Sequence, residues 1–174
     1  MALIIGIDPG KSGAVAAITE AGAVVRLDDT PLVAGGYDVA AMAGMLSVYR
    51  PEDVALVVLE QSQSMPGQGV ASTFAIGVGF GLWWGVIATL GLPLEFVRPC
   101  VWVRAILKGQ PGEGKARALG YVARRFPGAE LTPPRCRVPR DGRADALCLA
   151  VWGMGRRRIL LEHERRELCN SSDV

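Results

Sequence analysis

Two short runs of the chain are almost entirely apolar and rich in β-branched residues, and each of them ends in a carboxylate. The runs are residues 2–8 (ALIIGID) and 54–60 (VALVVLE), which end at Asp8 and Glu60. Runs of this length and composition are typical of strands that are buried on both faces. Such strands need helices on both sides, which constrains the chain to an α/β domain. Functional side chains of α/β domains gather beyond the carboxyl ends of the strands, where both carboxylates stand.

The rest of the sequence predicts a five-stranded mixed sheet flanked by helices. Three more strands are expected at 13–19, 23–28 and 94–97. Helices are expected at 39–49, 99–107, 113–126 and 141–154, and a long glycine-rich helix follows a polar loop at 61–69. The order places three strands in a meander before the parallel strands. We expect one domain over residues 1–155 and a basic, charged C-terminal tail over 156–174.

The net charge of +2 hides a segregation of sign along the chain. The chain up to Val97 has a net charge of about −6, and the remainder has about +8. A basic half of this size favours a polyanion partner such as nucleic acid.

The segment from Phe74 to Leu94 contains no charge and is long enough to span a membrane. Its glycine content, the ending at Pro93 and the lack of a flanking basic cluster argue against insertion. Three glycines fall on one helical face, which allows another backbone to approach closely. We therefore expect a soluble helix that is buried on several sides and includes a subunit interface of a homodimer at Gly77, Gly81 and Gly85.

A third acidic position is the pair Asp141 and Asp145, which share one face of the last predicted helix. Together with Asp8 and Glu60 they would place four carboxylates at one edge of the sheet. Such a cluster needs neutralisation, and Mg²⁺ or Mn²⁺ prefers oxygen ligands. Two ions per site would suit the hydrolysis of a phosphodiester.

Other chemistries lose support from the composition. The single His163 lies in the charged tail, and the four cysteines form no C-x-x-C pair, which disfavours histidine-based catalysis and zinc sites. The run GIDPGKSG resembles part of a phosphate-binding loop. Its first glycine is misplaced, because Ile5 stands where glycine is required, and a strand is expected to follow instead of a helix.

Four segments in order, GIDPGKSGAVA, VVLEQ, P-x-x-W and DGRADALCLA, resemble the RuvC-type Holliday junction resolvases, in particular the phage and chloroplast branch. The resemblance covers roughly residues 3–153 and implies the RNase H-like fold. It implies a homodimer that binds a four-way DNA junction and nicks two opposing strands in a metal-dependent reaction. By motif, the catalytic and metal-binding residues would be Asp8, Glu60, Asp141 and Asp145. The spacing of Asp141 fits the chloroplast-like branch.

The resemblance also places Lys115 near the active site, where it would contact the scissile phosphate or orient water. Further basic residues are candidates for DNA backbone phosphates: Lys108, Lys115, Arg117, Arg124, Arg125, Arg137, Arg140 and Arg143. In the loop after Glu60, three glutamines could pair with base edges, and a methionine could wedge into an opened junction. These residues are Gln61, Gln63, Gln68 and Met65.

The expected function is therefore a Mg²⁺-dependent, structure-selective endodeoxyribonuclease, for which Mn²⁺ would also support activity. Two alternatives stay open: a junction-binding protein with a weak or dead site, and an actin-like phosphotransferase, which would need a second related domain. We expect a cytoplasmic, nucleoid-associated protein of phage or bacterial origin that makes no contact with a membrane.

Overall fold

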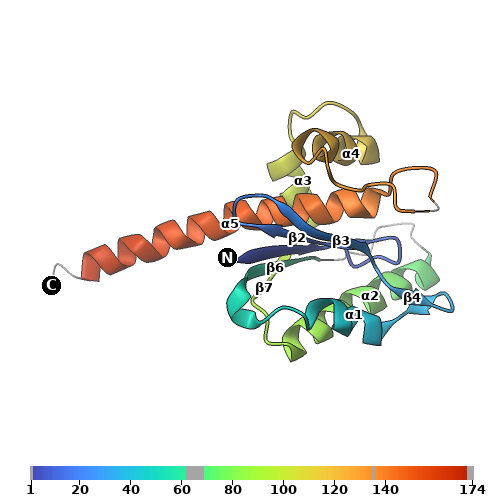
Figure 1. Cartoon of the computed structure of the whole chain (residues 1–174), viewed down its shortest axis with the longest axis horizontal. Coiled ribbons are helices and arrows are strands. Elements are labelled where there is room, and N and C mark those ends of the chain that lie inside the picture. Colours follow the sequence, from blue (N-terminus) through green and yellow to red (C-terminus); the bar gives the residue numbers. More distant parts are fainter. Residues whose placement is uncertain (1, 62–68, 135, 172–174) are drawn as a thin grey trace.

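A five-stranded mixed sheet between two layers of helices forms the body of the computed structural model (Figure 1). The structure describes residues 2–61, 69–134 and 136–171. The sheet has the order β3-β2-β1-β6-β7, and it confirms the predicted five-stranded mixed sheet. Its strands are β1 (Leu3–Ile7), β2 (Ala14–Thr19), β3 (Val24–Asp29), β6 (Val54–Glu60) and β7 (Leu94–Val97). Strand β2 is antiparallel to both of its neighbours, β1 and β3, and β1, β6 and β7 run parallel.

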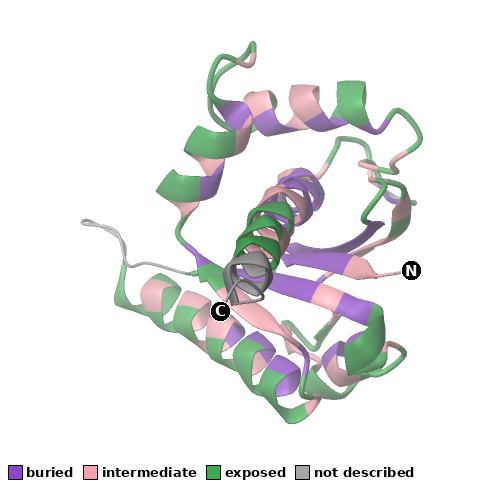
Figure 2. Ribbon diagram, turned by 90° about the vertical axis from the view of Figure 1, so that its left-hand side faces the viewer, coloured by how far each residue is buried: buried purple, intermediate pink, exposed green. Residues whose placement is uncertain are grey.

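Helices cover both faces of the sheet, so its central strands are buried on both sides (Figure 2). One face packs against α3 (Pro99–Leu107), α4 (Gly114–Arg125) and α5 (Asp141–Ser171). The other packs against α1 (Val39–Leu46) and α2 (Val70–Thr89). Local sequence sets several of these boundaries. Pro99 starts α3, and the Asp38 carboxylate caps α1 by accepting the N–H of Ala41 at 2.9 Å.

Two glycines allow α5 to lie directly on the sheet. A Cβ atom added at Gly6 of β1 would lie 2.2 Å from the carbonyl oxygen of Ala146 and 2.4 Å from the nitrogen of Ala150. One added at Gly153 of α5 would lie 2.6 Å from Cγ2 of Val58. The helix and the central strands therefore meet at backbone distance, which fixes where α5 sits above β1 and β6.

The structure differs from the sequence predictions in the loop before α1 and at the end of the chain. A small hairpin of β4 (Leu32–Val33) and β5 (Gly36–Tyr37) was not predicted. The last helix was expected to end at residue 154, but α5 continues to Ser171 and projects beyond the sheet (Figure 1). A single 3₁₀ turn, η1 (Pro51–Asp53), precedes β6.

The segment GIDPGKSG leads from β1 into β2, a strand, so it does not have the strand-to-helix arrangement of a phosphate-binding loop. The Lys11 ammonium donates to the carbonyl oxygen of Gly35 at 2.6 Å and lies 5.9 Å from the ring centre of Tyr37. Lys11 therefore holds the β4–β5 hairpin against the turn that follows β1.

Helix α2 is buried on one side only, which corrects the expectation of burial on several sides. Its buried residues are Gly79, Trp83, Val86 and Ile87. Among the described residues, α2 is the one helix that is long and apolar enough to cross a membrane, with a mean hydropathy of 1.6 and 22% of that window buried. Length and composition alone give weak support for a membrane span. An apolar helix face thus remains exposed along most of its length.

Candidate functional site

Parallel pairing of β1 with β6 brings Asp8 and Glu60 to the same edge of the sheet. Ile7 of β1 lies beside Leu59 of β6, and each carboxylate is the next residue of its strand. Asp8 is partly buried, and its Oδ1 accepts the N–H of Gly10 at 3.1 Å. A Cβ at Gly13 would lie within 2.9 Å of the Asp8 Cγ, so the turn closes tightly over this carboxylate.

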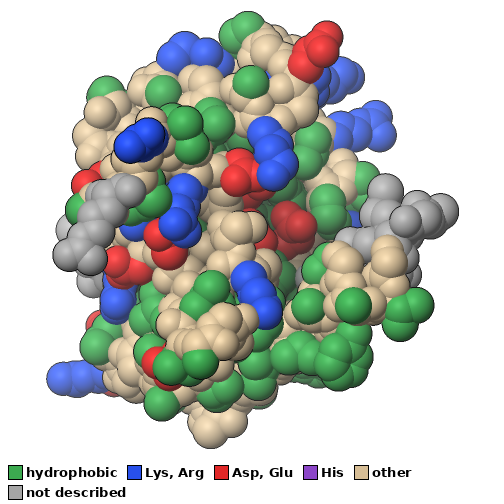
Figure 3. Space-filling view, turned by 90° about the vertical axis from the view of Figure 1, so that its right-hand side faces the viewer, with side chains coloured by type: hydrophobic (Ala, Val, Ile, Leu, Met, Phe, Trp, Pro, Cys, Tyr) green, Lys and Arg blue, Asp and Glu red, His purple; other side chains and the backbone are tan. Residues whose placement is uncertain are grey.

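The first turns of α5 add Asp141 and Asp145 to this edge. A Cβ at Gly142 would lie 2.2 Å from the carbonyl oxygen of Ser12, so the start of α5 touches the β1–β2 turn. Asp145 stands one helical turn further along α5. It lines a cleft together with Glu60. Acidic side chains gather in a hollow on this face of the molecule, with basic side chains around them (Figure 3). The four predicted carboxylates thus come from three distant segments of the chain to one place.

Mutual repulsion and burial disturb the ionisation of this cluster. Burial, followed by the charge of Asp8, raises the pKa of Glu60 to about 7. Burial, followed by the charges of Asp8, Glu60 and Asp141, also raises the pKa of Asp145 to about 7. The pKa of Asp8 is raised by burial and by Asp141, against the hydrogen bond from Gly10. The cluster therefore carries more negative charge than the protein compensates.

Asp141 is the exception, because it has a cationic partner. Burial acts to raise its pKa, but the hydrogen bond and charge of Lys115 outweigh burial and lower it. The Lys115 ammonium pairs directly with Oδ2 of Asp141, and the lysine side chain is 80% exposed. Lys115 therefore lies at the mouth of the cluster.

The donor set of the site suits a hard divalent cation, because all four groups supply carboxylate oxygens. As the side chains stand, however, no group of three or more His, Cys, Asp or Glu within the described ranges is close enough to hold a metal ion. Three of the carboxylates are bound to protein donors instead: Asp8 to Gly10, Glu60 to Trp102, and Asp141 to Lys115. The chemistry of the ligands fits a cation, and their present positions do not close around one point.

A cleft of about 370 Å³ adjoins the carboxylates between β6, α3, α4 and α5. Its polar lining combines Glu60 and Asp145 with the basic residues Lys115 and Arg117. Its apolar lining comes from α3 and α4, namely Pro99, Trp102, Val103, Leu107 and Ala118. The cleft thus combines cationic groups from α4 with anionic groups from β6 and α5.

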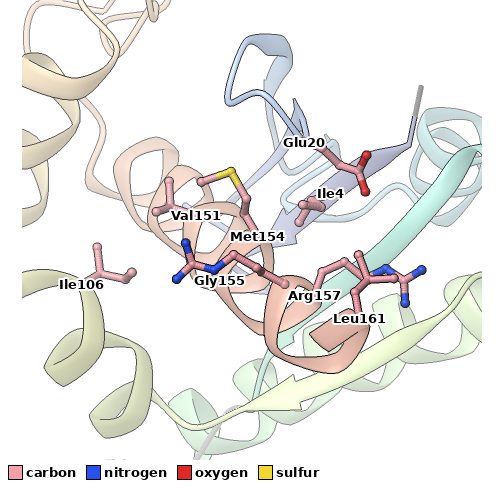
Figure 4. Close-up of a pocket in the computed structure, with 9 residues that line it drawn as sticks. Ile4, Glu20, Ile106, Val151, Met154, Gly155, Arg157 and Leu161 are labelled. Carbon is pink, nitrogen blue, oxygen red and sulfur yellow. The ribbon is translucent and has the colours of Figure 1, made fainter. Parts of the chain in front are cut away.

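A larger cavity of about 580 Å³ lies away from this site, at the start of β1 and beside the projecting part of α5 (Figure 4). It contains none of the four carboxylates. Its lining is mainly apolar, with charged side chains at Glu20, Arg157 and Arg158. We assign it no role in the chemistry.

The predicted phosphate-contacting residues are distributed over more than one region. Lys115 and Arg117 line the cleft. Lys108, Arg124, Arg125 and Arg137 are exposed. Nη2 of Arg125 lies beside Gly22 in the β2–β3 turn, at the opposite end of the sheet from the carboxylates. Lys115 and Arg117 are therefore the basic residues that the structure places against the site.

Arg143 is misassigned as a phosphate contact. Arg143 is only 6% exposed. Its guanidinium donates to Asp29 Oδ1 and to the carbonyl oxygen of Glu130, both at 2.7 Å. Arg140 also pairs with Asp29, at 3.2 Å, and is half-exposed. The two arginines tie the start of α5 to β3, so they support the position of Asp141 and Asp145.

The loop after Glu60 is described only at its ends. Gln61 is exposed, and its N–H donates to the carbonyl oxygen of Val97 at 2.8 Å. Gln63, Met65 and Gln68 lie outside the described residues. Their assignment to DNA contacts stays a prediction.

The three glycines predicted for a subunit interface lie in open space on α2. A Cβ at Gly77, Gly81 or Gly85 would meet no atom within 4 Å. Gly81 and Gly85 also line a groove of about 300 Å³ between α1 and α2. The face that they define is therefore free to receive another chain.

The sequence patterns assigned no site role to Trp102, the tryptophan of the P-x-x-W segment, but the structure places it in contact with Glu60. The residue is 4% exposed, and its indole N–H donates to Oε2 of Glu60 at 2.8 Å. A buried tryptophan N–H usually finds a polar partner, and that rule was the available signal.

Because the pKa values of two carboxyls are raised, we expect the metal-free protein to lose stability as the pH rises. Glu60 and Asp145 have ordinary pKa values of 4.5 and 3.8, and both rise to about 7 in the folded protein. Their contribution to folding is present at low pH and is lost as the pH rises to about 7. We expect the free energy of unfolding in EDTA to fall by on the order of 2 to 4 kcal/mol between about pH 5 and about pH 8.

Urea unfolding at both pH values measures this effect, and Mg²⁺ should restore the lost stability at the higher pH. Asp145→Asn removes one of the two shifted groups and should flatten the dependence. If the free energy of unfolding depended on pH equally in the variant and the parent, these carboxyls would not be the origin of that dependence.

Comparison with solved structures shows which fold this is. Thermus thermophilus RuvC in complex with a Holliday junction substrate superimposes with a TM-score of 0.62 at 18% identity, over 86% of this chain and 91% of that one. A second Thermus thermophilus RuvC structure superimposes with a TM-score of 0.57 at 19% identity, and the match covers 85% of this chain and 90% of that one. The yeast mitochondrial Holliday junction resolvase Ydc2 superimposes with a TM-score of 0.53 at 15% identity, and the match covers 97% of this chain and 83% of that one.

These likenesses confirm the predicted RNase H-like α/β fold. No protein-family model matches the chain, and no curated protein matches its sequence.

Proposed function

We propose that this protein is a divalent-cation-dependent endonuclease that cuts four-way DNA junctions by paired nicks. The observation that carries the proposal is the meeting of Asp8, Glu60, Asp141 and Asp145 at one sheet edge of an RNase H-like fold. Their repulsion indicates a need for cations, and the basic half of the chain suits a polyanion. RuvC, which shares the fold, has been solved with a Holliday junction substrate.

In the proposed reaction the four carboxylates would hold Mg²⁺ or Mn²⁺, with two ions per site. Such ions supply Lewis acidity toward the phosphodiester and a nucleophilic water at neutral pH. Lys115, which is exposed at the mouth of the site, would contact the phosphate. Arg117, which lines the same cleft, would hold a neighbouring phosphate and thereby fix the register of the strand.

The decisive experiment incubates an end-labelled four-way junction with the protein in Mg²⁺ or in EDTA, beside a linear duplex of the same sequence. We expect paired nicks in the junction with Mg²⁺ only, and little cutting of the duplex. Nicking in EDTA would refute the metal dependence, and equal cutting of the duplex would refute the selectivity for junctions.

A junction-binding protein without cleavage is the second candidate. Two observations favour it: the side chains within the described ranges do not close around one metal position, and Lys115 already neutralises Asp141. Tight junction binding with no nicks in Mg²⁺ or Mn²⁺ would select this function over the first.

We further propose that the protein acts in the cytoplasm, at the nucleoid, as a homodimer joined through the exposed face of α2. A second copy would cover the open glycines and the neighbouring exposed side chains of Phe74 and Trp84, which are 72% and 50% exposed. A dimer also gives two active sites, which paired nicking requires.

Gly81→Leu is expected to convert the dimer to a monomer, because a branched side chain would hold the two helices apart. Sedimentation of the purified protein without detergent measures the mass. Gly44→Leu is the matched control, since Gly44 lies on α1 and also has open space around it. A dimeric Gly81→Leu protein would place the interface elsewhere, and a parent protein that stays in the membrane fraction would favour insertion of α2.

A further inference from the structure

We propose that Trp102 is a positioning residue that fixes the orientation of the Glu60 carboxylate through its indole N–H. The inference rests on the proposed metal-dependent function, because Glu60 is one of the groups assigned to cation binding. Trp102 itself would touch neither the cation nor the DNA.

The contact is well formed and sheltered. Nε1 of Trp102 donates to Oε2 of Glu60 at 2.8 Å, across 42 residues of sequence. The tryptophan is 4% exposed and belongs to the main core on the α5 side of the sheet. A buried donor in a packed ring has a fixed direction, so it selects one rotation of the carboxylate.

The hydrogen bond uses one oxygen of Glu60 and leaves the other for the site. Within the part of the chain that the structure describes, Oε1 of Glu60 receives no hydrogen bond. Glu60 and Asp145 line one cleft together with Trp102, so the carboxylate that Trp102 orients belongs to that cleft. Donors that orient a ligating carboxylate typically change metal affinity or activity by 10- to 100-fold when removed.

The position of Trp102 follows from the backbone around it. The residue lies in the first turn of α3, three residues after Pro99, and β7 leads into that helix directly after pairing with Glu60 at Val97. The strand pairing that places Glu60 therefore also places the start of α3. This arrangement explains why a tryptophan on a different element reaches the last residue of β6.

Trp83 provides a matched control within the same chain. It is fully buried on the other face of the sheet, and its indole N–H has no hydrogen-bond partner within the described residues. A tryptophan-to-phenylalanine change thus replaces a buried indole with a smaller aromatic ring at both positions. Only at Trp102 does it also remove a hydrogen bond to a carboxylate of the site.

The test compares Trp102→Phe with Trp83→Phe by titrating Mn²⁺ alone and measuring free Mn²⁺ by electron paramagnetic resonance. We expect Trp102→Phe to weaken Mn²⁺ binding by about tenfold or more and Trp83→Phe to leave it within about twofold. In a Glu60→Gln background, Trp102→Phe should have no further effect, because the group through which it acts is gone. Equal losses in the two tryptophan variants, or full additivity with Glu60→Gln, would overturn the proposal.

A spectroscopic readout separates this proposal from the proposed function. The chain has four tryptophans, whose ¹⁵N-labelled indole signals can be assigned by single replacements. Glu60→Gln should move the Trp102 signal and leave the Trp83 signal in place. An unmoved Trp102 signal refutes the hydrogen bond whatever the enzyme does. A moved signal in a protein that binds no Mn²⁺ refutes the metal-dependent function, and with it the consequence for cation binding.

Discussion

Asp8→Asn is expected to reduce junction cleavage by roughly a thousandfold or more while leaving junction binding unchanged or tighter. Asp8 is coupled to the rest of the cluster: its charge raises the pKa of Glu60 and of Asp145, and the charge of Asp141 raises that of Asp8. The change removes a cation ligand, and it also removes a negative charge close to where DNA phosphates would lie. Single-turnover nicking in Mg²⁺ and gel-shift binding in EDTA measure the two effects separately.

Asp38→Asn is the matched control for this experiment. Asp38 caps α1 through its carboxylate, and asparagine caps helices as well as aspartate does. The control should therefore cut and bind like the parent protein. An Asp8→Asn protein that nicks at near the parental rate would mean that the cluster is not the catalytic centre.

Gly6→Ala is expected to destabilise the whole domain by about 3 kcal/mol or more. The added methyl group would meet backbone atoms of α5 at Ala146 and Ala150, and backbone cannot move aside as a flexible side chain can. The helix would have to lift from β1 and carry Asp145 away from Asp8. Urea or thermal unfolding by circular dichroism measures the loss, and lower cleavage should accompany it at temperatures where the variant is still folded.

Gly44→Ala tests whether the effect comes from the close approach rather than from the loss of glycine. Gly44 lies within α1, and its added methyl group would meet nothing within 4 Å. Alanine is the better helix former by about 1 kcal/mol, so this variant should match or exceed the stability of the parent. A Gly6→Ala protein that unfolds at the same urea concentration as Gly44→Ala would contradict the packing described above.

Sequence patterns predicted most of the fold because the main elements have strong local signals. Buried strands such as 54–60 read as apolar β-branched runs, and Pro99 and Asp38 mark the starts of their helices. The β4–β5 hairpin escaped prediction because its strands have two residues each and its turn contains Ala34 with a φ of 48°. Two residues give no measurable periodicity, and a left-handed alanine is not expected from sequence.

The last helix was expected to end at residue 154 because the sequence becomes strongly charged after it, but α5 continues to Ser171. Gly153 serves close packing against Val58 and Ile4, and the helix continues through it. Arg156 supports the continuation by donating from Nε to Glu95 of β7 at 2.8 Å. Helix-ending and packing roles of glycine look alike in a sequence, and only the neighbouring strand distinguishes them.

The four carboxylates at the sheet edge were predictable because Asp8 and Glu60 come at the ends of strands and Asp141 and Asp145 share one face at the start of the last helix, whereas their supporting residues were not. Arg143 was expected at the DNA surface, but it is buried against Asp29, which lies 114 residues earlier in the chain. The hydrogen bond between Trp102 and Glu60 also joins residues far apart in the chain, so no local sequence pattern predicts it. Such pairings depend on how α3 and α5 dock on the sheet, and no local periodicity encodes that docking.

The uninterrupted course of α5 has a practical consequence for experiments on this protein. At 1.5 Å per residue its 31 residues span roughly 45 Å from Asp141 to Ser171. An affinity tag or a fluorophore joined after the last turn would therefore stand at the far tip of a stiff rod. Immobilisation by that tip should leave the acidic hollow facing the bulk solution, and a dye there would report on tumbling and mass from a point remote from the carboxylates.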